Sequence, residues 1–527
     1  MSSSKSPEWT RLLSTSSYSY LHDLTGNALT TGLDGSIYLA GITSGDLDGQ
    51  IYDGGNGDAF ISKFNPDGTK DWTRLLGTSS YDDGNALTTG SDGSIYIAGQ
   101  TNGDLDGQTN NGFYDAFISK FNPDGTKVWS RLLGTTKDEN IGSLTTGSDG
   151  SIYAAGQTTG NLNGQTNNGN YDAFISKFNP DGTNEWTRLI GSSGSDVGRE
   201  LTTGSDGSIY ITGSSNGAAY ISKFNPDGTK EWQKSVGTPY FYDYAVAITT
   251  GNDGSIYITG GCGNSNIHGY KTFDVFISKF NPDGTNEWTK IFGSSSELGQ
   301  NYDYGHALTT GSDGSIYIAG TTNGNLDEQT NNNDNGTGDA FIIKYSSDGT
   351  KDWTILLGSS SSDEGNALTT GNDGSIYISG RTEGDLDGQS NSDGNWPDVF
   401  ITKYTFNQKL DVSSHQIGKS YNLAYIKDYD GNFHANTGSV SDETKSAYKY
   451  QGLIDVNADG TKEAIYTNKE SGRWVTASIN SSTGEIDYSD HGSGGTTRVV
   501  GIYIDPLVTS GEVEQFGPHD SQRRFQN

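Results

Sequence analysis

The five-residue phrase Asp-Gly-Ser-Ile-Tyr occurs seven times in this chain, and its spacing constrains the fold more than any other feature. The copies are separated by 58, 57, 57, 47, 60 and 60 residues and begin at Asp34, Asp92, Asp149, Asp206, Asp253, Asp313 and Asp373. A repeat of this length indicates one supersecondary unit that buries its apolar faces against its neighbours. We therefore expect a repeat architecture.

Each repeat contains four runs of strand length with turn signals between them. In order these are ALTTG, SIYIAG, DAFISKF and a run that begins near Trp, such as DWTRLLG. Asp-Gly separates the first two runs and Asn-Pro-Asp-Gly separates the last two, and both sequences are typical of tight turns. Both alternating faces of the third run carry apolar side chains, as expected for a sheet that packs between two others. Four strands per unit predict one blade of a β-propeller.

The two ends of the repeat predict how the ring closes. The Trp-containing runs begin at Trp9, Trp72, Trp129, Trp186, Trp232, Trp288 and Trp353. The first precedes the first repeat, and none follows the last repeat after Tyr404. The segment Glu8–Leu13 is therefore expected to supply the outer strand of the seventh blade, which leaves no open sheet edge. We predict an all-β chain with a seven-bladed propeller over residues 7–406 and a smaller β-rich domain over residues 407–527.

The phrase DAFISKFNPDGTKVWSRLLG, which begins at Asp115, resembles the bacterial β-propeller repeat family called SBBP. The resemblance extends over about three quarters of the chain, since the phrase is matched seven times. It implies a propeller fold and an association with extracellular or surface proteins. It does not imply a reaction.

The charge of the chain limits its partners. Asp and Glu number 65 against 33 Lys and Arg, which gives a formal net charge of −32. Nucleic acid is excluded as a partner because phosphate binding needs clustered Lys and Arg. No apolar run approaches the roughly 18 residues of a membrane span, and the first residues lack the apolar segment of a signal peptide. The expected location is extracellular or on the cell surface, reached without an N-terminal signal peptide, as a monomer or as part of a larger chain.

Acidic loops between the second and third strands of the repeat are candidate calcium sites. Carboxylates two residues apart in a Gly-containing loop, with a third at the start of the next strand, offer several oxygen ligands to calcium. The same residue types also hold tight turns, and the sequence leaves both interpretations open. The candidates are Asp46, Asp48 and Asp58; Asp104, Asp106 and Asp115; and Asp385, Asp387 and Asp398.

Tyrosines gather in the connections that enter the first strand of several repeats. A flat apolar ring beside Asp and Asn suits the binding of a glycan or of a cell-surface protein. The alternative is that these rings anchor their loops between blades, since Tyr combines an apolar body with a polar tip. The candidate ligand-binding residues are Tyr81, Tyr240, Tyr242, Tyr244, Tyr302 and Tyr304.

The repeat ends near residue 406, and the last segment carries a different acidic motif. Asp455, Asn457, Asp459 and Glu463 follow the pattern D-x-N-x-D-G-x-x-E, and Tyr466 stands where an EF-hand needs its last Glu. The segment resembles the FG-GAP or VCBS type of calcium loop in secreted bacterial proteins. The resemblance implies calcium at these four residues, and the sequence leaves open whether the domain is complete.

No catalytic motif recurs in the repeat. The seven histidines occupy no fixed position, and no metal-binding His spacing, nucleophile elbow, P-loop or dinucleotide fingerprint is present. The run ALTTG is nearly identical in most repeats, which predicts a uniform channel lining. We therefore expect a non-enzymatic calcium-binding adhesion or ligand-binding module. One alternative is a structural spacer of a larger surface protein, and another is a propeller hydrolase or lyase that uses a histidine such as His22 or His306.

Overall fold

The computed structural model describes residues 6–15, 24–236, 242–265, 271–294, 302–327, 329–331, 338–391 and 397–405, together with short strands beyond residue 406. The chain divides into two compact units, residues 1–406 and residues 407–527. All regular elements of the described residues are β-strands. In this part of the chain no helix is long and apolar enough to cross a membrane.

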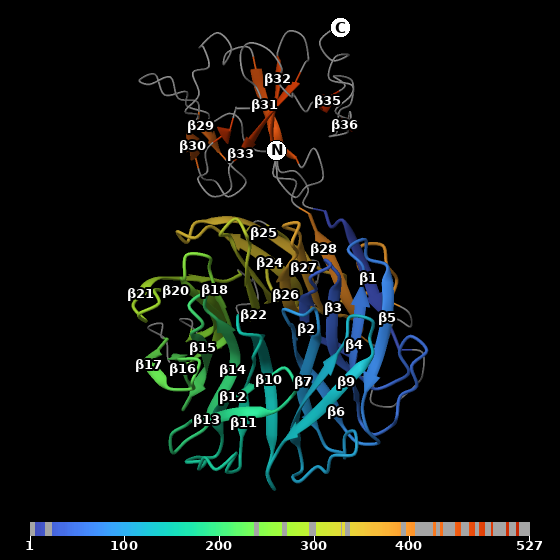
Figure 1. Cartoon of the computed structure of the whole chain (residues 1–527), viewed down its shortest axis with the longest axis vertical. Coiled ribbons are helices and arrows are strands. Elements are labelled where there is room, and N and C mark those ends of the chain that lie inside the picture. Colours follow the sequence, from blue (N-terminus) through green and yellow to red (C-terminus); the bar gives the residue numbers. More distant parts are fainter. Residues whose placement is uncertain are drawn as a thin grey trace. The chain divides into compact units, whose positions relative to one another are not determined.

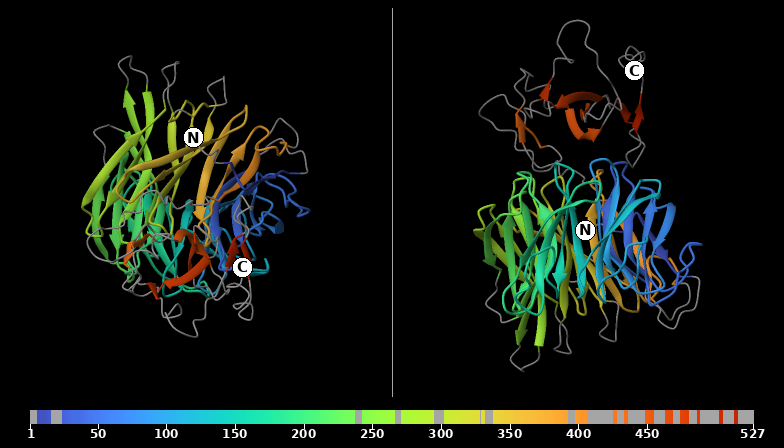
Figure 2. Two further views of the ribbon diagram at one scale, coloured as in Figure 1. Left: turned by 90° about the horizontal axis from the view of Figure 1, so that it is seen from above. Right: turned by 60° about the horizontal axis from the view of Figure 1, so that its bottom comes forward.

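The first unit consists of seven four-stranded antiparallel sheets that follow one another around a common axis (Figures 1 and 2), which confirms the predicted propeller. Blade 1 contains β2 (Leu24–Thr31), β3 (Ile37–Thr43), β4 (Asp58–Phe64) and β5 (Lys70–Leu76), and blade 2 contains β6 (Asp82–Thr89), β7 (Ile95–Thr101), β8 (Asp115–Phe121) and β9 (Lys127–Leu133). Blade 3 contains β10 (Glu139–Thr146), β11 (Ile152–Thr158), β12 (Asp172–Phe178) and β13 (Asn184–Ile190), and blade 4 contains β14 (Asp196–Thr203), β15 (Ile209–Ser215), β16 (Ala218–Phe224) and β17 (Lys230–Ser235). Blade 5 contains β18 (Tyr242–Thr250), β19 (Ile256–Ser265), β20 (Lys271–Phe280) and β21 (Asn286–Phe292), and blade 6 contains β22 (Asp303–Thr310), β23 (Ile316–Thr322), β24 (Asp339–Tyr345) and β25 (Lys351–Leu357).

Blade 7 joins the two ends of the propeller. Its sheet has the order β1-β28-β27-β26, with β1 (Trp9–Leu13) from the N-terminal end and β26 (Asp363–Thr370), β27 (Ile376–Thr382) and β28 (Asp398–Tyr404) from the last repeat. Strand β1 pairs antiparallel with β28, from Trp9 opposite Lys403 to Leu13 opposite Val399, and the two strands lie side by side in Figure 1. This is the closure that the number and position of the Trp-containing runs predict.

The innermost strands of the seven blades form a closed ring of their own. The last Thr of each inner strand donates its hydroxyl to the backbone carbonyl of the corresponding Thr in the preceding blade, at 3.0 to 3.3 Å. The seven donors are Thr31, Thr89, Thr146, Thr203, Thr250, Thr310 and Thr370. The conserved Thr of the repeat therefore links every blade to the one before it.

The apolar core is also shared between blades. Every residue of β3 and of β4 is buried, because both faces of the sheet are covered by neighbouring sheets. Each of seven apolar clusters combines side chains from two consecutive blades, including the last and the first. Closing the ring therefore completes one of these clusters as well as one sheet.

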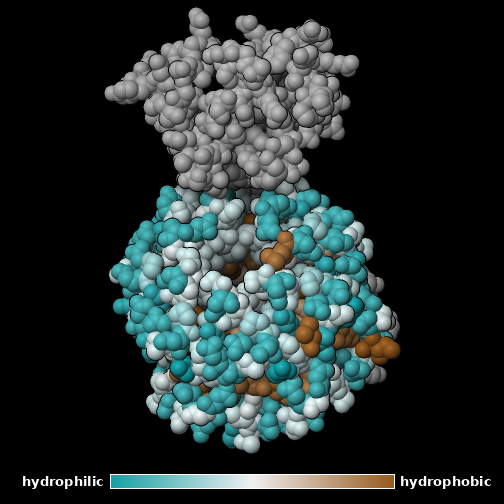
Figure 3. Space-filling view, viewed as in Figure 1, coloured by the Kyte–Doolittle hydropathy of each residue, from teal (hydrophilic) through white to brown (hydrophobic). Residues whose placement is uncertain are grey.

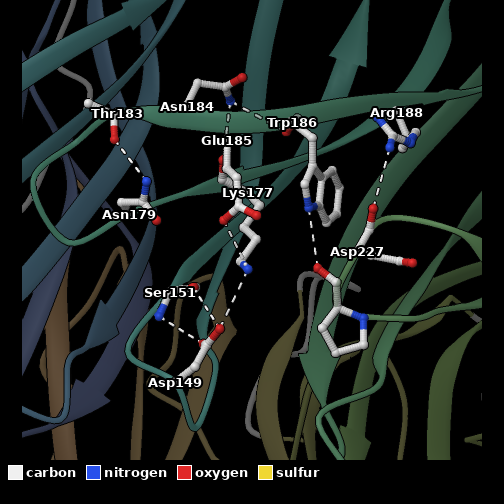
Figure 4. A network of polar contacts seen from close by, with 11 residues as sticks. Asp149, Ser151, Lys177, Asn179, Thr183, Asn184, Glu185, Trp186, Arg188 and Asp227 are labelled. Atoms are coloured by element: carbon white, nitrogen blue, oxygen red, sulfur yellow. Dashed lines mark hydrogen bonds and ion pairs between the residues drawn. The ribbon is translucent and has the colours of Figure 1, made fainter.

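Polar contacts join the outer strand of one blade to a turn of the next (Figure 4). Trp186 in β13 donates its indole N–H to Pro226 O at 3.2 Å, and Arg188 donates from Nε to Gly228 O at 3.1 Å. A Cβ on Gly228 would lie 2.9 Å from the Trp186 ring, so only glycine leaves room for the ring. The Trp, Arg and Asn-Pro-Asp-Gly parts of the repeat thus form one contact between blades.

A second group in Figure 4 explains the Asp of the phrase Asp-Gly-Ser-Ile-Tyr. Asp149 accepts a hydrogen bond from Ser151 N–H at 3.0 Å, as Asp does in many tight turns. Lys177 lies 3.5 Å from Asp149 and 3.0 Å from Glu185, and its ammonium group stands over the Tyr153 ring. This Asp is therefore a structural residue of the turn.

The contact of Trp186 with the next blade makes a measurable prediction. Trp186→Phe is expected to lower the free energy of unfolding by about 1 kcal/mol more than Trp232→Phe does, because both changes replace an indole by a smaller ring but only the first also removes a hydrogen bond, the one to Pro226. Trp232→Phe is the matched control, since Trp232 Nε1 has no hydrogen-bond partner among the described residues. Equal losses in the two variants, measured by denaturant unfolding, would contradict a role for the hydrogen bond.

The second unit contains short strands. The strands β31 (Tyr448–Ile454), β32 (Glu463–Asn468), β33 (Trp474–Ile479) and β34 (Ile486–Asp487) form one sheet in that order. The strands β29 (Tyr425–Lys427) and β30 (Phe433–Ala435) form a pair, as do β35 (Ile502–Ile504) and β36 (Val513–Gln515). Of the predicted calcium loop, Glu463 begins β32, and Asp455, Asn457 and Asp459 lie outside the described residues.

Candidate functional site

A β-bulge in each inner strand places one unpaired residue on the wall of the central channel. In β2 the pairing with β3 shifts between Gly26 and Ala28, which leaves Asn27 as the extra residue. A bulge of this kind redirects a side chain and is frequent beside functional sites. The equivalent residues around the ring are Asn27, Asn85, Gly142, Arg199, Val246, His306 and Asn366.

These residues line a cavity of about 560 Å³ inside the ring. It lies at the beginning of the inner strands, the end that the long connections between blades enter. The space-filling view shows a mostly hydrophilic surface that is hollowed over β22 and β26 (Figure 3). The volume is within the range of small-molecule sites, roughly 300 to 1,000 Å³.

One side of the cavity carries a chain of amide and carboxylate groups. Asn27 donates from Nδ2 to Asp83 Oδ1 at 3.1 Å, and Asn85 donates from Nδ2 to Asn140 Oδ1 at 3.4 Å. Tyr81 donates its hydroxyl to Asp83 Oδ2 at 3.3 Å. Tyr81, a predicted ligand-binding residue, therefore holds a carboxylate of the cavity wall.

The opposite side carries charged and titratable side chains. Burial raises the pKa of Glu200 to about 8, and Glu200 Oε2 accepts a hydrogen bond from Ile248 N–H at 2.5 Å. Burial lowers the pKa of His306 to about 4. At neutral pH the protonated Glu200 therefore offers an O–H donor, the neutral His306 offers one donor and one acceptor, and Arg199 provides a positive charge.

An aromatic cluster adjoins this side of the cavity. Phe273 lies with its ring centre 6.2 Å from that of Tyr302 and 5.7 Å from that of Tyr304. Tyr304 in turn lies 6.1 Å from the ring of His306, which lines the cavity. Tyr244 lies 6.4 Å from Phe273, and its pKa is raised mainly by burial. The structure thus brings together three of the predicted tyrosines, Tyr244, Tyr302 and Tyr304, at the edge of the cavity.

The structure does not place the other three predicted tyrosines in this cluster. Tyr240 lies outside the described residues, and Tyr242 begins β18 with a side chain that the structure does not describe. Tyr81 lies in a separate aromatic group, 5.9 Å from Tyr114. His22, the other histidine considered for catalysis, also lies outside the described residues.

The carboxylates of each acidic loop are engaged in different contacts and do not converge. In the first loop, Asp46 Oδ1 accepts a hydrogen bond from Tyr52 N–H at 2.9 Å, as expected of a turn residue. Asp48 adopts a left-handed φ of 52° and contacts Lys70 and Thr73. Asp58 is buried at the start of β4, where Oδ2 accepts a hydrogen bond from Asp53 N–H.

In the other two acidic loops the carboxylates are likewise engaged in separate contacts. Asp104 and Asp385 each accept a hydrogen bond from a backbone N–H six residues later, at 2.9 Å. Asp106 contacts Lys127 and Ser130, and Asp387 contacts Thr10, while Asp115 and Asp398 are buried at strand starts. In the part of the chain that the structure describes, no three His, Cys, Asp or Glu residues form a metal-binding group. These contacts fit the turn interpretation, and calcium binding by these loops stays a prediction.

The asymmetry of the channel corrects the expectation of a uniform lining. The sequence did not predict Arg199, Glu200 and Asp83 as site residues. The expectation of a uniform lining rested on ALTT, which is the part of the strand that does not vary. The sequence signal for this site was the residue that follows Gly in this run, because it varies between repeats. It is Asn in GNALTT, His306 in GHALTT and Arg199 in GRELTT. This position varies because the bulge turns it toward the channel, where packing does not restrict its identity.

The sequence profile described as the SBBP β-propeller repeat matches residues 71–106, 185–220 and 287–327. A second profile, described as the β-propeller domain of unknown function DUF5122, matches residues 90–127 and 147–183. The regulatory protein FlaEY of Caulobacter vibrioides is 27% identical over 209 residues, which are 35% of this chain and 21% of that protein. The match thus spans about a fifth of the length of FlaEY.

Solved structures with a similar fold include three enzymes. The periplasmic gluconolactonase of Pseudomonas aeruginosa is 10% identical, with a TM-score of 0.40 over 63% of this chain and 84% of that one. The polysaccharide lyase Uly1 is 11% identical, with a TM-score of 0.41 over 74% and 92%. A puromycin hydrolase is 9% identical, with a TM-score of 0.43 over 86% and 61%.

The prediction that this chain is not an enzyme is wrong as an exclusion, because solved structures that it resembles are named as a gluconolactonase, a polysaccharide lyase and a puromycin hydrolase. The physical reason is that a channel of this kind can carry titratable groups independently of the repeat, as it does here at Glu200 and His306. At these identities the similarity shows the fold alone and assigns no reaction. The matches to the repeat profile agree with the seven four-stranded blades, and the chain contains SBBP β-propeller repeats at these three stretches.

Proposed function

We propose that this propeller binds a carbohydrate at the edge of its central cavity. The observation that carries the proposal is the position of the cluster formed by Phe273, Tyr302 and Tyr304, which adjoins the cavity wall through His306. We call these three residues the aromatic cluster. It places flat apolar rings beside the polar groups of the wall.

The chemistry of a sugar ring matches both parts of this arrangement. One face of the ring carries C–H groups that pack on an aromatic side chain, and its edge carries hydroxyls that both donate and accept hydrogen bonds. The wall supplies both kinds of partner, with donors on Arg199 and on protonated Glu200, and with acceptors on Asp83 and the Asn side chains.

The proposal retains the glycan-binding part of the sequence-based expectation and changes its location. The aromatic residues that we assign to the ligand belong to blades 5 and 6, and the polar partners are residues that the loop motifs did not include. A requirement for calcium, an extracellular location and a role in adhesion stay predictions. They are supported by the acidic composition and by the repeat family, and they are independent of the cavity.

A glycan panel followed by calorimetric titration of the best ligand tests this proposal. Tyr304→Ala is expected to weaken binding at least tenfold, about 1.4 kcal/mol, because it removes the ring of the aromatic cluster that lies next to His306. Phe113→Ala is the control, since Phe113 is an exposed aromatic residue that does not line the cavity. The control should change affinity less than twofold. Failure to bind any glycan, or equal affinities of wild type and Tyr304→Ala, would contradict the proposal.

A further inference from the structure

Pairs of acidic side chains lie at the junctions between consecutive blades, away from the cavity. At the junction of blades 1 and 2, Asp58 begins the third strand of one blade and Asp82 begins the first strand of the next. Asp82 N–H donates to Gly57 O at 2.8 Å, which fixes the two residues side by side. Both have 0% of their surface exposed. The backbone therefore forces two buried carboxyl groups together.

One oxygen of each carboxyl group is fully engaged. Asp82 Oδ2 accepts hydrogen bonds from Thr78 N–H at 2.6 Å and from Thr78 Oγ1 at 2.9 Å, and Asp58 Oδ2 accepts one from Asp53 N–H at 3.0 Å. The other oxygens, Asp58 Oδ1 and Asp82 Oδ1, are buried and have no hydrogen-bond partner of normal geometry among the described residues, although the Thr101 hydroxyl lies near enough to Asp82 to lower its pKa. Burying a polar atom without a hydrogen-bond partner costs free energy of folding, and a bound ligand would offset this cost at the two free oxygens.

A third free oxygen lies at the same junction. The Tyr52 hydroxyl is buried and without a hydrogen-bond partner among the described residues. Asp58 and Asp82 are both close enough to act electrostatically on this phenol. No Lys or Arg in the described part of the chain forms an ion pair with either carboxyl group. Tyr52, Asp58 and Asp82 therefore interact electrostatically at a buried junction where neither carboxyl group is paired with a Lys or Arg of the described residues.

The backbone is shaped to leave this space open. A Cβ on Gly77 would lie 2.4 Å from Asp58 Oδ1, so any larger residue would displace the carboxylate. At the junction of blades 5 and 6, a Cβ on Gly293 would lie 2.2 Å from Asp274 Oδ1 and 3.1 Å from Asp303 Oδ2. Carboxylates from two different blades thus both lie next to this glycine. Glycine at the end of the outer strand is what allows them to meet.

We propose that Asp58, Asp82 and Tyr52 bind a divalent cation of the calcium type between blades 1 and 2. Such a cation takes oxygen ligands from carboxylates and neutral groups and completes its shell with water. It would neutralise both carboxylates and give each free oxygen a partner. It would also join two blades that are otherwise connected by their inner strands, their packing and their turns. The donor set differs from the loop motif, which combines Asp58 with Asp46 and Asp48.

The junction of blades 2 and 3 provides a natural comparison. Asp115 and Glu139 occupy the equivalent positions, and Glu139 N–H donates to Tyr114 O at 2.9 Å. Both oxygens of Asp115 accept backbone hydrogen bonds, from Asn111 and Gly112. Both oxygens of Glu139 accept hydrogen bonds as well, from Thr135 and Thr158. The same charge is present there without a free oxygen, so no cation is expected.

The test compares two double variants of the full chain, each of which removes two buried carboxylates. Asp58→Asn/Asp82→Asn changes the proposed site, and Asp115→Asn/Glu139→Gln changes the comparison junction. Each side-chain amide keeps an oxygen that can accept the hydrogen bond from the loop. Bound calcium is counted by equilibrium dialysis with elemental analysis, and thermal unfolding is recorded with chelator and with calcium chloride.

We expect the first variant to bind one calcium ion fewer per chain than wild type, with a smaller calcium-dependent rise of the unfolding temperature. The second variant should keep the wild-type number of ions. If the first double variant does not fold, Asp58→Asn alone is expected to raise the dissociation constant of one site at least tenfold. An unchanged count in the first variant, as a shared proton or a buried water would produce, would overturn the proposal. Equal losses in both double variants would overturn it too, because they would indicate unspecific attraction by acidic residues.

Discussion

Deletion of residues 1–13 is expected to open the propeller and to lower its free energy of unfolding by at least about 5 kcal/mol. Trp9 and Leu13 are 9% and 3% exposed, and each large apolar side chain contributes roughly 1.5 to 3 kcal/mol when it is buried. Strand β1 also provides all five backbone pairings with β28, and Trp9 Nε1 donates to Pro66 O at 3.1 Å in blade 1. The deletion therefore removes a strand, part of a core cluster and a contact between blades.

The deletion should also change how the protein associates. Without β1, strand β28 becomes an unpaired sheet edge, which is a template for pairing with another chain. We expect concentration-dependent oligomers in analytical ultracentrifugation and a lower midpoint in denaturant unfolding. Deletion of residues 1–5, which leaves β1 intact, is the control and should behave as wild type. A monomer of unchanged stability after the longer deletion would show that β1 is not needed to close the ring.

Gly99→Ala is expected to destabilise the propeller by about 3 kcal/mol or more, the upper part of the range for overpacked sites. A Cβ on Gly99 would lie 1.8 Å from the backbone oxygen of Asp83. The β-bulge brings this carbonyl toward β7, so the clash can be relieved only if the bulge itself moves. The equivalent glycines of the other six blades meet a backbone oxygen at 1.7 to 2.0 Å, and they are Gly41, Gly156, Gly213, Gly260, Gly320 and Gly380.

The matched control for this substitution is Gly142→Ala in blade 3. Gly142 is itself the bulge residue, and a Cβ there would meet only Arg199 O, at 3.6 Å. The change in unfolding free energy should stay within about 0.5 kcal/mol, as for a substitution without new contacts. Denaturant unfolding followed by tryptophan fluorescence measures both variants. Equal effects of the two substitutions would show that the bulge does not require glycine on the paired strand.

The strands, turns and closure of the propeller could be predicted from the sequence, because each repeat encodes the strands and turns of its own blade. Asp-Gly and Asn-Pro-Asp-Gly mark the turns locally, and the seven Trp-containing runs indicate the closing strand by their number and position. Only part of the candidate site could be predicted from the sequence. Tyr244, Tyr302 and Tyr304 could be identified as candidates, since they stand beside Asp and Asn in the connections between repeats, but nothing in the sequence indicated that they meet beside His306.

The residues Arg199 and Glu200 show why the rest of the cavity was missed. A β-bulge has no strong local signature, and it alone decides that Arg199 faces the channel while its neighbours pair with the next strand. The pKa of Glu200 is raised by burial inside the ring, where Ile248 of the next blade donates its backbone N–H to the carboxyl group. That effect belongs to the closed ring, and no stretch of sequence near Glu200 carries it.

The sequence by itself determined the number of blades, their strand order and the way the ring closes, because these follow from short-range turn chemistry and from counting repeats. Only the tertiary structure decided which polar groups meet. Asp58 and Asp82 lie in different blades, and Asp82 N–H must bond to Gly57 O before their carboxyl groups share a buried space. Contacts of this kind depend on the stacking of one blade on the next, and stacking fixes distances that no single repeat contains.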